Sequence, residues 1–134
     1  MKKDIDFGSV EGIAVAIATN LNEDGQQTWD VYLINYNDYP LENVLITSKG
    51  YGEIDGQEVK TSLLRHMFEH IESKSFVKIE PIDPAIFHLN NEYWVSYYVD
   101  KKIFDKKFVF VPDSITEANL IEINMLQLKG VLHS

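Results

Sequence analysis

Alternating apolar and polar residues from 90 to 111 predict a long β-hairpin, and the rest of the chain is organised around it. With Lys101-Lys102 as its two-residue turn, antiparallel pairing places Tyr93 opposite Phe110 on an almost wholly apolar face. A three-residue loop that begins at Asp100 is the alternative, because Lys-Lys lacks the glycine or asparagine typical of tight hairpin turns. The apolar face is expected to pack against a second sheet, since an isolated hairpin is only marginally stable in water.

The other face of this hairpin is amphipathic and gives the best sequence indication of a function. It carries Trp94 and Tyr98, and large aromatic side chains with polar handles are enriched where proteins bind one another. Tyr32, on the strand expected at residues 28–35, and Tyr36, just after it, are expected near them. The alternative is that a helix or the C-terminal tail covers these rings within the monomer. The first possibility predicts a protein-binding sheet face, and the second predicts a covered one.

Lysines gather at the turn end of the same hairpin. They are Lys101, Lys102, Lys106 and Lys107, with Asp100 and Asp105 among them. These six residues carry a local charge of +2, while the remainder of the chain carries −11. One interpretation is a sheet edge that lysines protect against the addition of further strands. The other is a docking tip for an acidic partner, so the four lysines join Trp94 and Tyr98 as candidate interaction residues.

Shorter apolar runs predict the other strands of the fold. They cover residues 13–18, 28–35, 43–48, 57–60 and 75–82, and Asp55-Gly56 is a hairpin-turn signal before the fourth of them. In the first run, large apolar residues alternate with alanine, which predicts a strand whose alanine side lies under another element. The segment before these strands is expected to enter the fold with Ile5 and Phe7 as anchors.

Two segments carry helical signals. Between Thr61 and Glu72, four apolar residues fall on one helical face, so a helix capped by Thr61 or Ser62 is expected. A short strand is the competing possibility, because strands surround this segment. Residues 114–117 match a capping box and predict a short helix from Ser114, followed by extended chain.

About seven short strands, with turn signals every 8 to 12 residues or so, are typical of two-sheet antiparallel folds. The sequence therefore predicts a mainly β protein, with an immunoglobulin-like two-sheet antiparallel sandwich and one or two short helices. A single domain over residues 1–134 is expected from the length. A partly closed barrel is the alternative architecture.

Composition narrows the range of functions. The chain is 45% hydrophobic and 25% charged, as in ordinary soluble globular domains. It has no cysteine, which excludes disulfides, thiolate metal sites and cysteine nucleophiles and fits a reducing compartment. The net charge of −9 disfavours nucleic acid as a partner, and no apolar run is long enough for a membrane span. We expect a non-catalytic cytoplasmic protein that binds another protein or itself through a β-sheet face, without a cofactor.

The sharpest catalytic motif is the H-x-x-E-H pattern formed by His66, Glu69 and His70, which inverted zinc metalloproteases use. On a helix the two histidines share a face and reach one zinc ion, with Glu69 beside them as the base. On a strand they lie about 13 Å apart, at about 3.3 Å per residue, and no common metal is possible. A metal-dependent hydrolase is therefore the alternative function, and it depends on a helix.

Other patterns give no catalytic residue. The glycines at 50, 52 and 56 lie among acidic residues that repel phosphate, so they predict a glycine-assisted hairpin rather than a phosphate loop. No G-x-S-x-G motif supplies a serine nucleophile. Glu80 and Asp83 flank Pro81 as a potential acid and base pair, but two nearby carboxylates are expected by chance in an acidic chain.

Four segments resemble a family of short uncharacterised bacterial proteins, and the likeness spans most of the chain. They are Leu64-Arg65-His66, Ser75-Phe76-Val77-Lys78-Ile79-Glu80-Pro81-Ile82, Leu89-Asn90-Asn91-Glu92-Tyr93-Trp94-Val95-Ser96 and Lys129-Gly130-Val131. Some members carry the name phenylalanyl-tRNA synthetase alpha subunit, so the resemblance implies at most an accessory role in aminoacylation. Class II synthetases hold ATP and the acyl-adenylate with an arginine in each of two motifs, whereas Arg65 is the only arginine of this chain. The resemblance thus implies a family without a catalytic mechanism.

Overall fold

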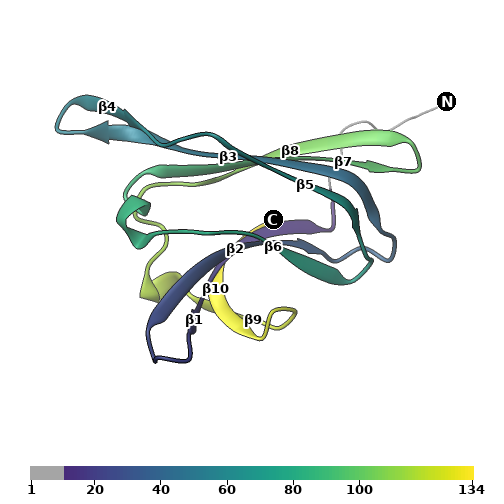
Figure 1. The fold of residues 1–134 in the computed structure, drawn as a ribbon, viewed down its shortest axis with the longest axis horizontal. Coiled ribbons are helices and arrows are strands. Elements are labelled where there is room, and N and C mark those ends of the chain that lie inside the picture. The colour runs from purple at the N-terminus through teal and green to yellow at the C-terminus, as the bar shows by residue number, and fades with distance from the viewer. Residues whose placement is uncertain (1–10) are drawn as a thin grey trace.

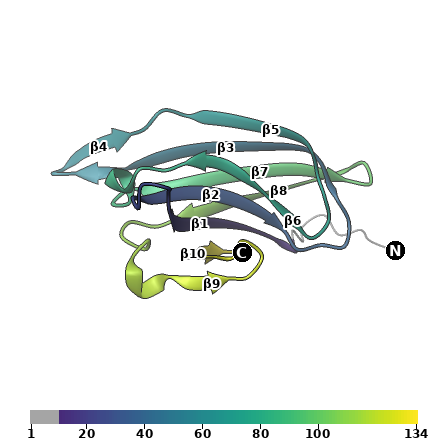
Figure 2. The same ribbon diagram turned by 60° about the horizontal axis from the view of Figure 1, so that its bottom comes forward.

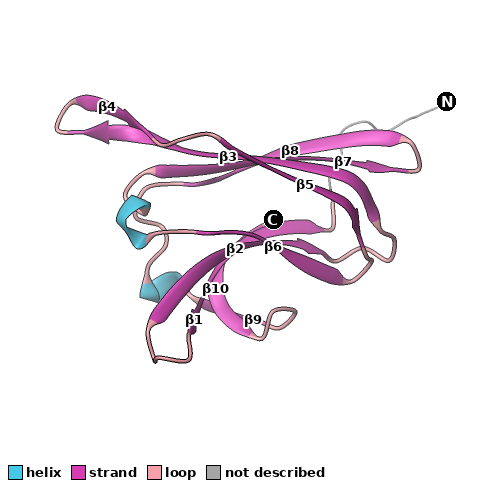
Figure 3. Ribbon diagram, in the orientation of Figure 1, coloured by secondary structure: helices cyan, strands magenta, loops and turns pink. Residues whose placement is uncertain are grey.

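In the computed structural model, which describes residues 11–134, the chain forms two antiparallel β-sheets stacked face to face (Figure 1). Strands make up nearly all of the regular structure, as Figure 3 shows. The two helical elements are single 3-10 turns, η1 (Pro84–Ile86) and η2 (Glu117–Asn119). The predicted mainly β fold with two antiparallel sheets is confirmed. The predicted anchors Ile5 and Phe7 lie outside the described residues.

The first sheet, sheet A, has the strand order β6-β2-β1-β10-β9. Its strands are β1 (Ile13–Leu21), β2 (Gln27–Asn35), β6 (Ser75–Pro81), β9 (Ile121–Ile123) and β10 (Leu128–His133). Ala16 and Ala18 of β1 form a second apolar cluster with Ile123 and Leu126 of the C-terminal hairpin. The predicted strand with a covered alanine side is therefore confirmed. Gly130 permits this close packing, because a Cβ atom there would lie 2.7 Å from a carbonyl oxygen of β1.

The second sheet, sheet B, has the order β4-β3-β7-β8, and β5 pairs with the same edge of β3 as β4 (Figure 2). Its strands are β3 (Leu41–Ile54), β4 (Gln57–Lys60), β5 (Leu64–Ile71), β7 (Asn90–Val99) and β8 (Lys102–Phe110). Thr61 fills the gap between β4 and β5. Its hydroxyl accepts a hydrogen bond from the N–H of Gly50 at 2.7 Å, and its own N–H donates to the Gly50 carbonyl at 2.9 Å. The edge of β3 is thus paired almost without interruption.

One main apolar core lies between the two sheets, and its side chains alternate along the strands that supply them. Among its residues are Val15, Ile17, Val31 and Leu33 from sheet A, and Val44, Ile46, Tyr93, Val95 and Phe108 from sheet B. Each fully buried side chain of this size contributes roughly 1.5 to 3 kcal/mol. The apolar face of the long hairpin therefore packs against a second sheet, as the sequence predicts.

The hairpin of β7 and β8 forms as predicted, but its register differs. Its turn is Asp100-Lys101 instead of Lys101-Lys102, and Tyr93 pairs with Phe108 rather than with Phe110. The φ angles of the two turn residues are 49° and 68°, which is the backbone of a type I′ turn. That turn follows the right-handed twist of the flanking strands, whatever residues occupy it. Because the pairing shifts by two residues, every side chain stays on its predicted face.

The segment from Thr61 to Glu72 is not the predicted helix, and the competing strand alternative is correct. This strand, β5, pairs with the first half of β3, so hydrogen bonding between distant segments outweighs the local helical spacing. Ile71 is buried in the core and Phe68 packs against it, whereas Leu64 and Met67 are exposed. The stripe of four apolar residues is therefore divided between the interior and the surface.

The helix predicted from Ser114 is also wrong. The hydroxyl of Ser114 donates to the carbonyl of Val111 at 2.7 Å instead of capping a helix, and only the single turn η2 follows. Burial of Ile115 in the main core holds this segment against the sheets. The extended chain expected after it is present as β9 and β10.

Candidate functional site

The outer face of sheet B, which points away from sheet A, carries a band of exposed apolar side chains. This apolar band consists of Met67 on β5, Trp94 and Tyr98 on β7, and Ile103 on β8, together with the half-buried Leu45 on β3. Met67 is 72% exposed, Trp94 45% and Tyr98 39%. The C-terminal strands pack in sheet A instead, so the alternative in which the tail covers Trp94 and Tyr98 is wrong.

Trp94 lies near the middle of this face. The row of residues in register with it consists of Arg65, Thr47, Trp94 and Lys107, on β5, β3, β7 and β8. The Nζ atom of Lys107 lies 4.9 Å from the centroid of the Trp94 ring, which is a cation–π distance. Trp94 therefore presents an exposed ring with a positive charge against one of its sides.

The four candidate lysines are divided between two faces and a turn. Lys107 lies on the outer face beside Trp94, whereas Lys106 belongs to the inward-facing positions of β8. The Nζ atom of Lys106 lies 5.1 Å from the ring centroid of the buried Phe108. Lys101 lies in the hairpin turn, and Lys102 begins β8 at an exposed end position on the same side of the strand as Lys106. The candidate set from the sequence is therefore not one continuous patch.

Tyr32 and Tyr36 do not lie near Trp94, and that expectation is wrong. They belong to the apolar cluster of sheet A, where the ring of Tyr32 packs edge-on against Phe76 at a centroid distance of 5.9 Å. The physical reason is strand pairing, because β2 pairs with β1 and β6 in the other sheet.

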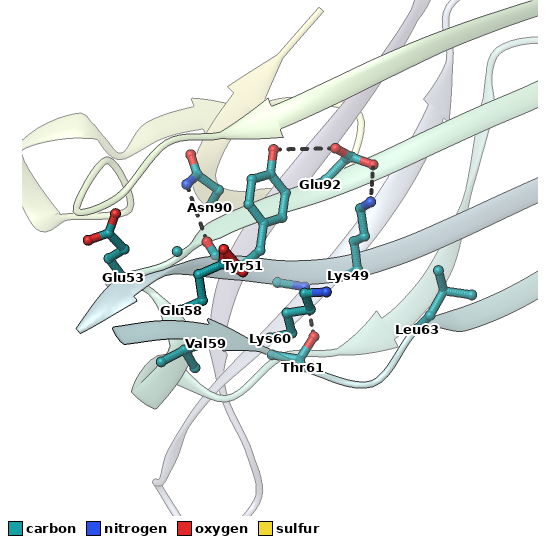
Figure 4. A pocket seen from close by; sticks show the side chains of 12 residues that line it. Lys49, Tyr51, Glu53, Glu58, Val59, Lys60, Thr61, Leu63, Asn90 and Glu92 are labelled. Atoms are coloured by element: carbon teal, nitrogen blue, oxygen red, sulfur yellow. Dashed lines mark hydrogen bonds and ion pairs between the residues drawn. The ribbon is translucent and has the colours of Figure 1, made fainter. Parts of the chain in front are cut away.

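A groove adjoins the apolar band where β3 continues past β5 and pairs with β4 (Figure 4). The groove has a volume of about 810 Å³, and its ionisable lining residues are Lys49, Tyr51, Glu53, Glu58, Lys60 and Glu92. The side chain of Glu92 is only 8% exposed, and the Nζ atom of Lys49 lies 3.8 Å from its carboxylate. The hydroxyl of Tyr51 donates to the same carboxylate at 3.3 Å. Burial raises the pKa of Tyr51, and the charge of Glu92 raises it further.

The hairpin of β3 and β4 forms the outer end of the groove. Asp55 and Gly56 make its turn with φ angles of 52° and 80°, so the hairpin predicted from Asp-Gly is confirmed. Glu53 and Glu58 lie directly opposite each other across the ladder, and like charges in such positions repel. Within residues 11–134 neither of them forms an ion pair. This part of the groove therefore favours a cation and disfavours phosphate.

The zinc-protease pattern fails on geometry, because His66, Glu69 and His70 lie on a strand. The two histidines are about 13 Å apart at the rise of a strand. Their contacts are His66 with Glu80 at 2.7 Å, and His70 with Glu42 at 2.7 Å and with Glu72 at 2.6 Å. In the described part of the chain, no group of three or more histidine, aspartate or glutamate residues is arranged to hold a metal ion.

Glu80 joins the two sheets through a polar cluster that the sequence analysis missed. From β6 of sheet A its carboxylate reaches sheet B, where it accepts hydrogen bonds from Ser48 at 2.9 Å and Tyr93 at 3.3 Å and meets His66. Burial raises the pKa of Tyr93, and the charge of Glu80 raises it further. Strand alternation marks Ser48 and Tyr93 as inward-facing. No sequence pattern connects either residue with Glu80.

This cluster is not a catalytic triad. In a Ser-His-acid triad the histidine lies between the other two groups, whereas here Glu80 lies between Ser48 and His66. The carboxylate of Asp83, the potential partner of Glu80, instead accepts a hydrogen bond from the N–H of Ala85 at 2.9 Å. The contacts of Glu80 are those of a structural link between sheets.

No helix within residues 11–134 combines the length and the apolar character that crossing a membrane requires. Comparisons with protein-family models, with curated proteins and with solved structures found no match. The resemblance to the short bacterial family therefore stays a prediction. The outer face of sheet B and the groove beside it are therefore the features that bear on function.

Proposed function

We propose that this chain is a non-catalytic cytoplasmic protein-interaction module whose contact surface is the outer face of sheet B. The observation that carries the proposal is the apolar band, in which Trp94 and Tyr98 remain exposed at the centre of a sheet. Tryptophan and tyrosine dominate binding hot spots, because they bury a large area for few rotatable bonds. Thr47, Ser96 and Arg65 lie among these rings and supply the polar contacts that such interfaces contain. A chain without cysteine fits the reducing conditions of the cytoplasm.

The face is large enough for a specific contact. The 10 residues of β7 span about 33 Å at the usual rise per residue. Four strands spaced about 4.8 Å apart are about 19 Å wide. The resulting area, roughly 600 Å², lies at the lower end of what each partner buries in specific interfaces, which is about 600 to 1,000 Å².

We also propose that the two sheets form an immunoglobulin-like sandwich. Two antiparallel sheets that share one core support this, as do the connections from β2 to β3 and from β6 to β7, which cross between the sheets. Sandwiches of this kind host many unrelated functions, so the fold alone does not select one. The proposed function is therefore inferred from the apolar band and not from the fold.

Site-specific photo-crosslinking in the cells that produce the chain tests the proposed contact surface. A photoreactive phenylalanine analogue replaces Ser96 on the outer face of sheet B or, as the control, Lys78 on sheet A. We expect a discrete cross-linked species only from position 96, and about tenfold less of it when Trp94→Ala is added. No adduct at position 96, or equal adducts at both positions, would contradict the proposal.

A further inference from the structure

Sheet B carries opposite charges at its two ends. The β3–β4 hairpin bears Glu53, Asp55 and Glu58 with one lysine, Lys60, and a net charge of −2. The β7–β8 hairpin bears Lys101 and Lys102 with Asp100 in the turn, and a net charge of +1. Figures 1 and 2 show these two hairpins at opposite ends of the sheet. All of these charged side chains are exposed, and within residues 11–134 none of them forms an ion pair. Both ends are therefore available to charges from outside the chain.

The two charged ends lie at similar distances from the middle of the apolar band. Glu53 is six residues along β3 from Thr47, the residue in register with Trp94, which corresponds to about 20 Å. Lys101 is seven residues from Trp94 along β7 and its turn, or about 23 Å. When two outer faces are stacked with their strands antiparallel, each acidic hairpin therefore lies over the lysine hairpin of the other copy.

The groove beside the acidic hairpin has the chemistry to receive a lysine. Lys49 already neutralises Glu92 at the inner wall of the groove. Lys60 also lines the groove but forms no ion pair with Glu53 or Glu58, so within residues 11–134 this repelling pair has no ion-pair partner. An incoming ammonium group relieves that repulsion, because it lies between two carboxylates. The ring of Tyr51 forms an aromatic wall of the groove, and the Nζ atom of Lys49 already lies 5.6 Å from its centroid, which is a cation–π distance.

We propose that the partner of the outer face is a second copy of this chain, with the lysine hairpin of each copy docked at the acidic groove of the other. This inference rests on the proposed function and names its partner. The contact is closed and two-fold symmetric, so the apolar band of each copy is buried against the other. Charge contacts at the two ends set the antiparallel orientation, and burial of the band around Trp94 provides most of the affinity.

The net charge of −9 opposes this association less than its size suggests. At physiological ionic strength charges are screened over about 8 Å, so the contacts at the two ends outweigh distant carboxylates. Arg65 and Lys107 repel their own counterparts only weakly. They stand on β5 and β8, the two edges of the sheet, where long side chains reach water.

A charge exchange tests the dimer. One variant carries Glu53→Lys and Glu58→Lys, and the other carries Lys101→Glu and Lys102→Glu. We expect light scattering after size exclusion to give a dimer for the unmodified chain and at least about a tenfold higher dissociation constant for each variant alone. An equimolar mixture of the two variants is expected to recover the dimer, because the exchanged ends are again complementary.

The control variant carries Glu23→Lys and Asp24→Lys in the exposed loop between β1 and β2, and its net charge changes by the same amount as that of the Glu53→Lys, Glu58→Lys variant. It is expected to remain a dimer, and circular dichroism verifies that every variant is folded. An unmodified chain that stays monomeric up to about 200 µM, variants that dimerise normally, or a mixture that stays monomeric would each overturn the inference.

If the cross-link at position 96 then joins the chain to a different protein, the proposed function stands without the dimer. If no cross-link forms there either, both fail.

Discussion

The Nε2 atom of His66 lies 2.7 Å from a carboxylate oxygen of Glu80, and this contact ties β5 of sheet B to β6 of sheet A. Ser48 and Tyr93 add hydrogen bonds from two further strands of sheet B to the same carboxylate. The side chain of Glu80 is only 12% exposed, and a carboxylate so far withdrawn from water needs such donors. One acidic side chain thus holds three strands of one sheet to the edge of the other.

Glu80→Ala is expected to lower the free energy of unfolding by about 2 to 4 kcal/mol, as measured by urea denaturation. The substitution removes the shared acceptor and leaves Ser48, Tyr93 and His66 without their partner inside the fold. Glu80→Gln keeps the shape and one acceptor oxygen, so it should cost less.

Glu23→Ala in the exposed β1–β2 loop is the matched control and should change the free energy of unfolding by less than about 0.5 kcal/mol. Equal effects of Glu80→Ala and Glu23→Ala would show that the carboxylate does not hold the sheets together.

His70 predicts a dependence of stability on pH. Hydrogen bonds with Glu72 and with Glu42 raise the pKa of His70 above its ordinary value of 6.5. Protonated His70 therefore stabilises the fold, and this contribution is fully present below the unfolded pKa and is lost as the pH rises through the folded pKa. We expect the difference in unfolding free energy between the unmodified chain and His70→Gln to be larger at about pH 6 than at about pH 9.

A proton NMR titration of the His70 ring separates this effect from other groups. Glu42→Gln with Glu72→Gln should bring the pKa of His70 back toward 6.5, because both hydrogen-bonding carboxylates are gone. An unchanged titration in that double variant would show that the two carboxylates do not set the pKa.

The turn at Asp100-Lys101 can be improved, because both residues have positive φ angles that non-glycine residues adopt at a cost. Replacement by Asn-Gly, the preferred type I′ pair, should raise the free energy of unfolding by about 0.5 to 1.5 kcal/mol. Lys101→Pro is the opposite control, since proline fixes a negative φ and should destabilise the hairpin. A loss of stability with Asn-Gly would place the turn at other residues.

Strand positions were predictable where alternation alone decides them. Tyr93 and Val95 lie on the almost wholly apolar face of the predicted hairpin, so their burial follows from the sequence. The register was not predictable, since it depends on a turn formed by Asp100 and Lys101, which lack the Asn-Gly or Asp-Gly pair typical of such turns. The strand at 64–71 was predicted only as the alternative to a helix, because its helical spacing is local whereas its pairing with β3 is not.

Some residues of the candidate site were also predictable from the sequence, and others were not. Trp94 and Tyr98 were identifiable because they lie on the polar side of an alternating strand. The groove was not, because β3 extends to Ile54, past the predicted end at Ser48, and meets β4 there. The link through Glu80 could not be foreseen either, since it joins side chains of two sheets and alternation along a strand does not show which strands of the two sheets face each other.

Tyr93 and Trp94 are neighbours in β7 that face opposite ways, so they form a matched pair for separating folding from binding. Tyr93 is 2% exposed in the core, and Tyr93→Ala should lower the free energy of unfolding by about 3 to 5 kcal/mol. Trp94→Ala should lower it by less than about 1 kcal/mol when the chain is dilute enough to be monomeric, yet it should weaken association about tenfold or more. Dilution matters, because any bound partner adds to the apparent stability of the unmodified chain. If Trp94→Ala lowers the free energy of unfolding nearly as much as Tyr93→Ala does, Trp94 stabilises the fold. That result would contradict the apolar band as a binding surface.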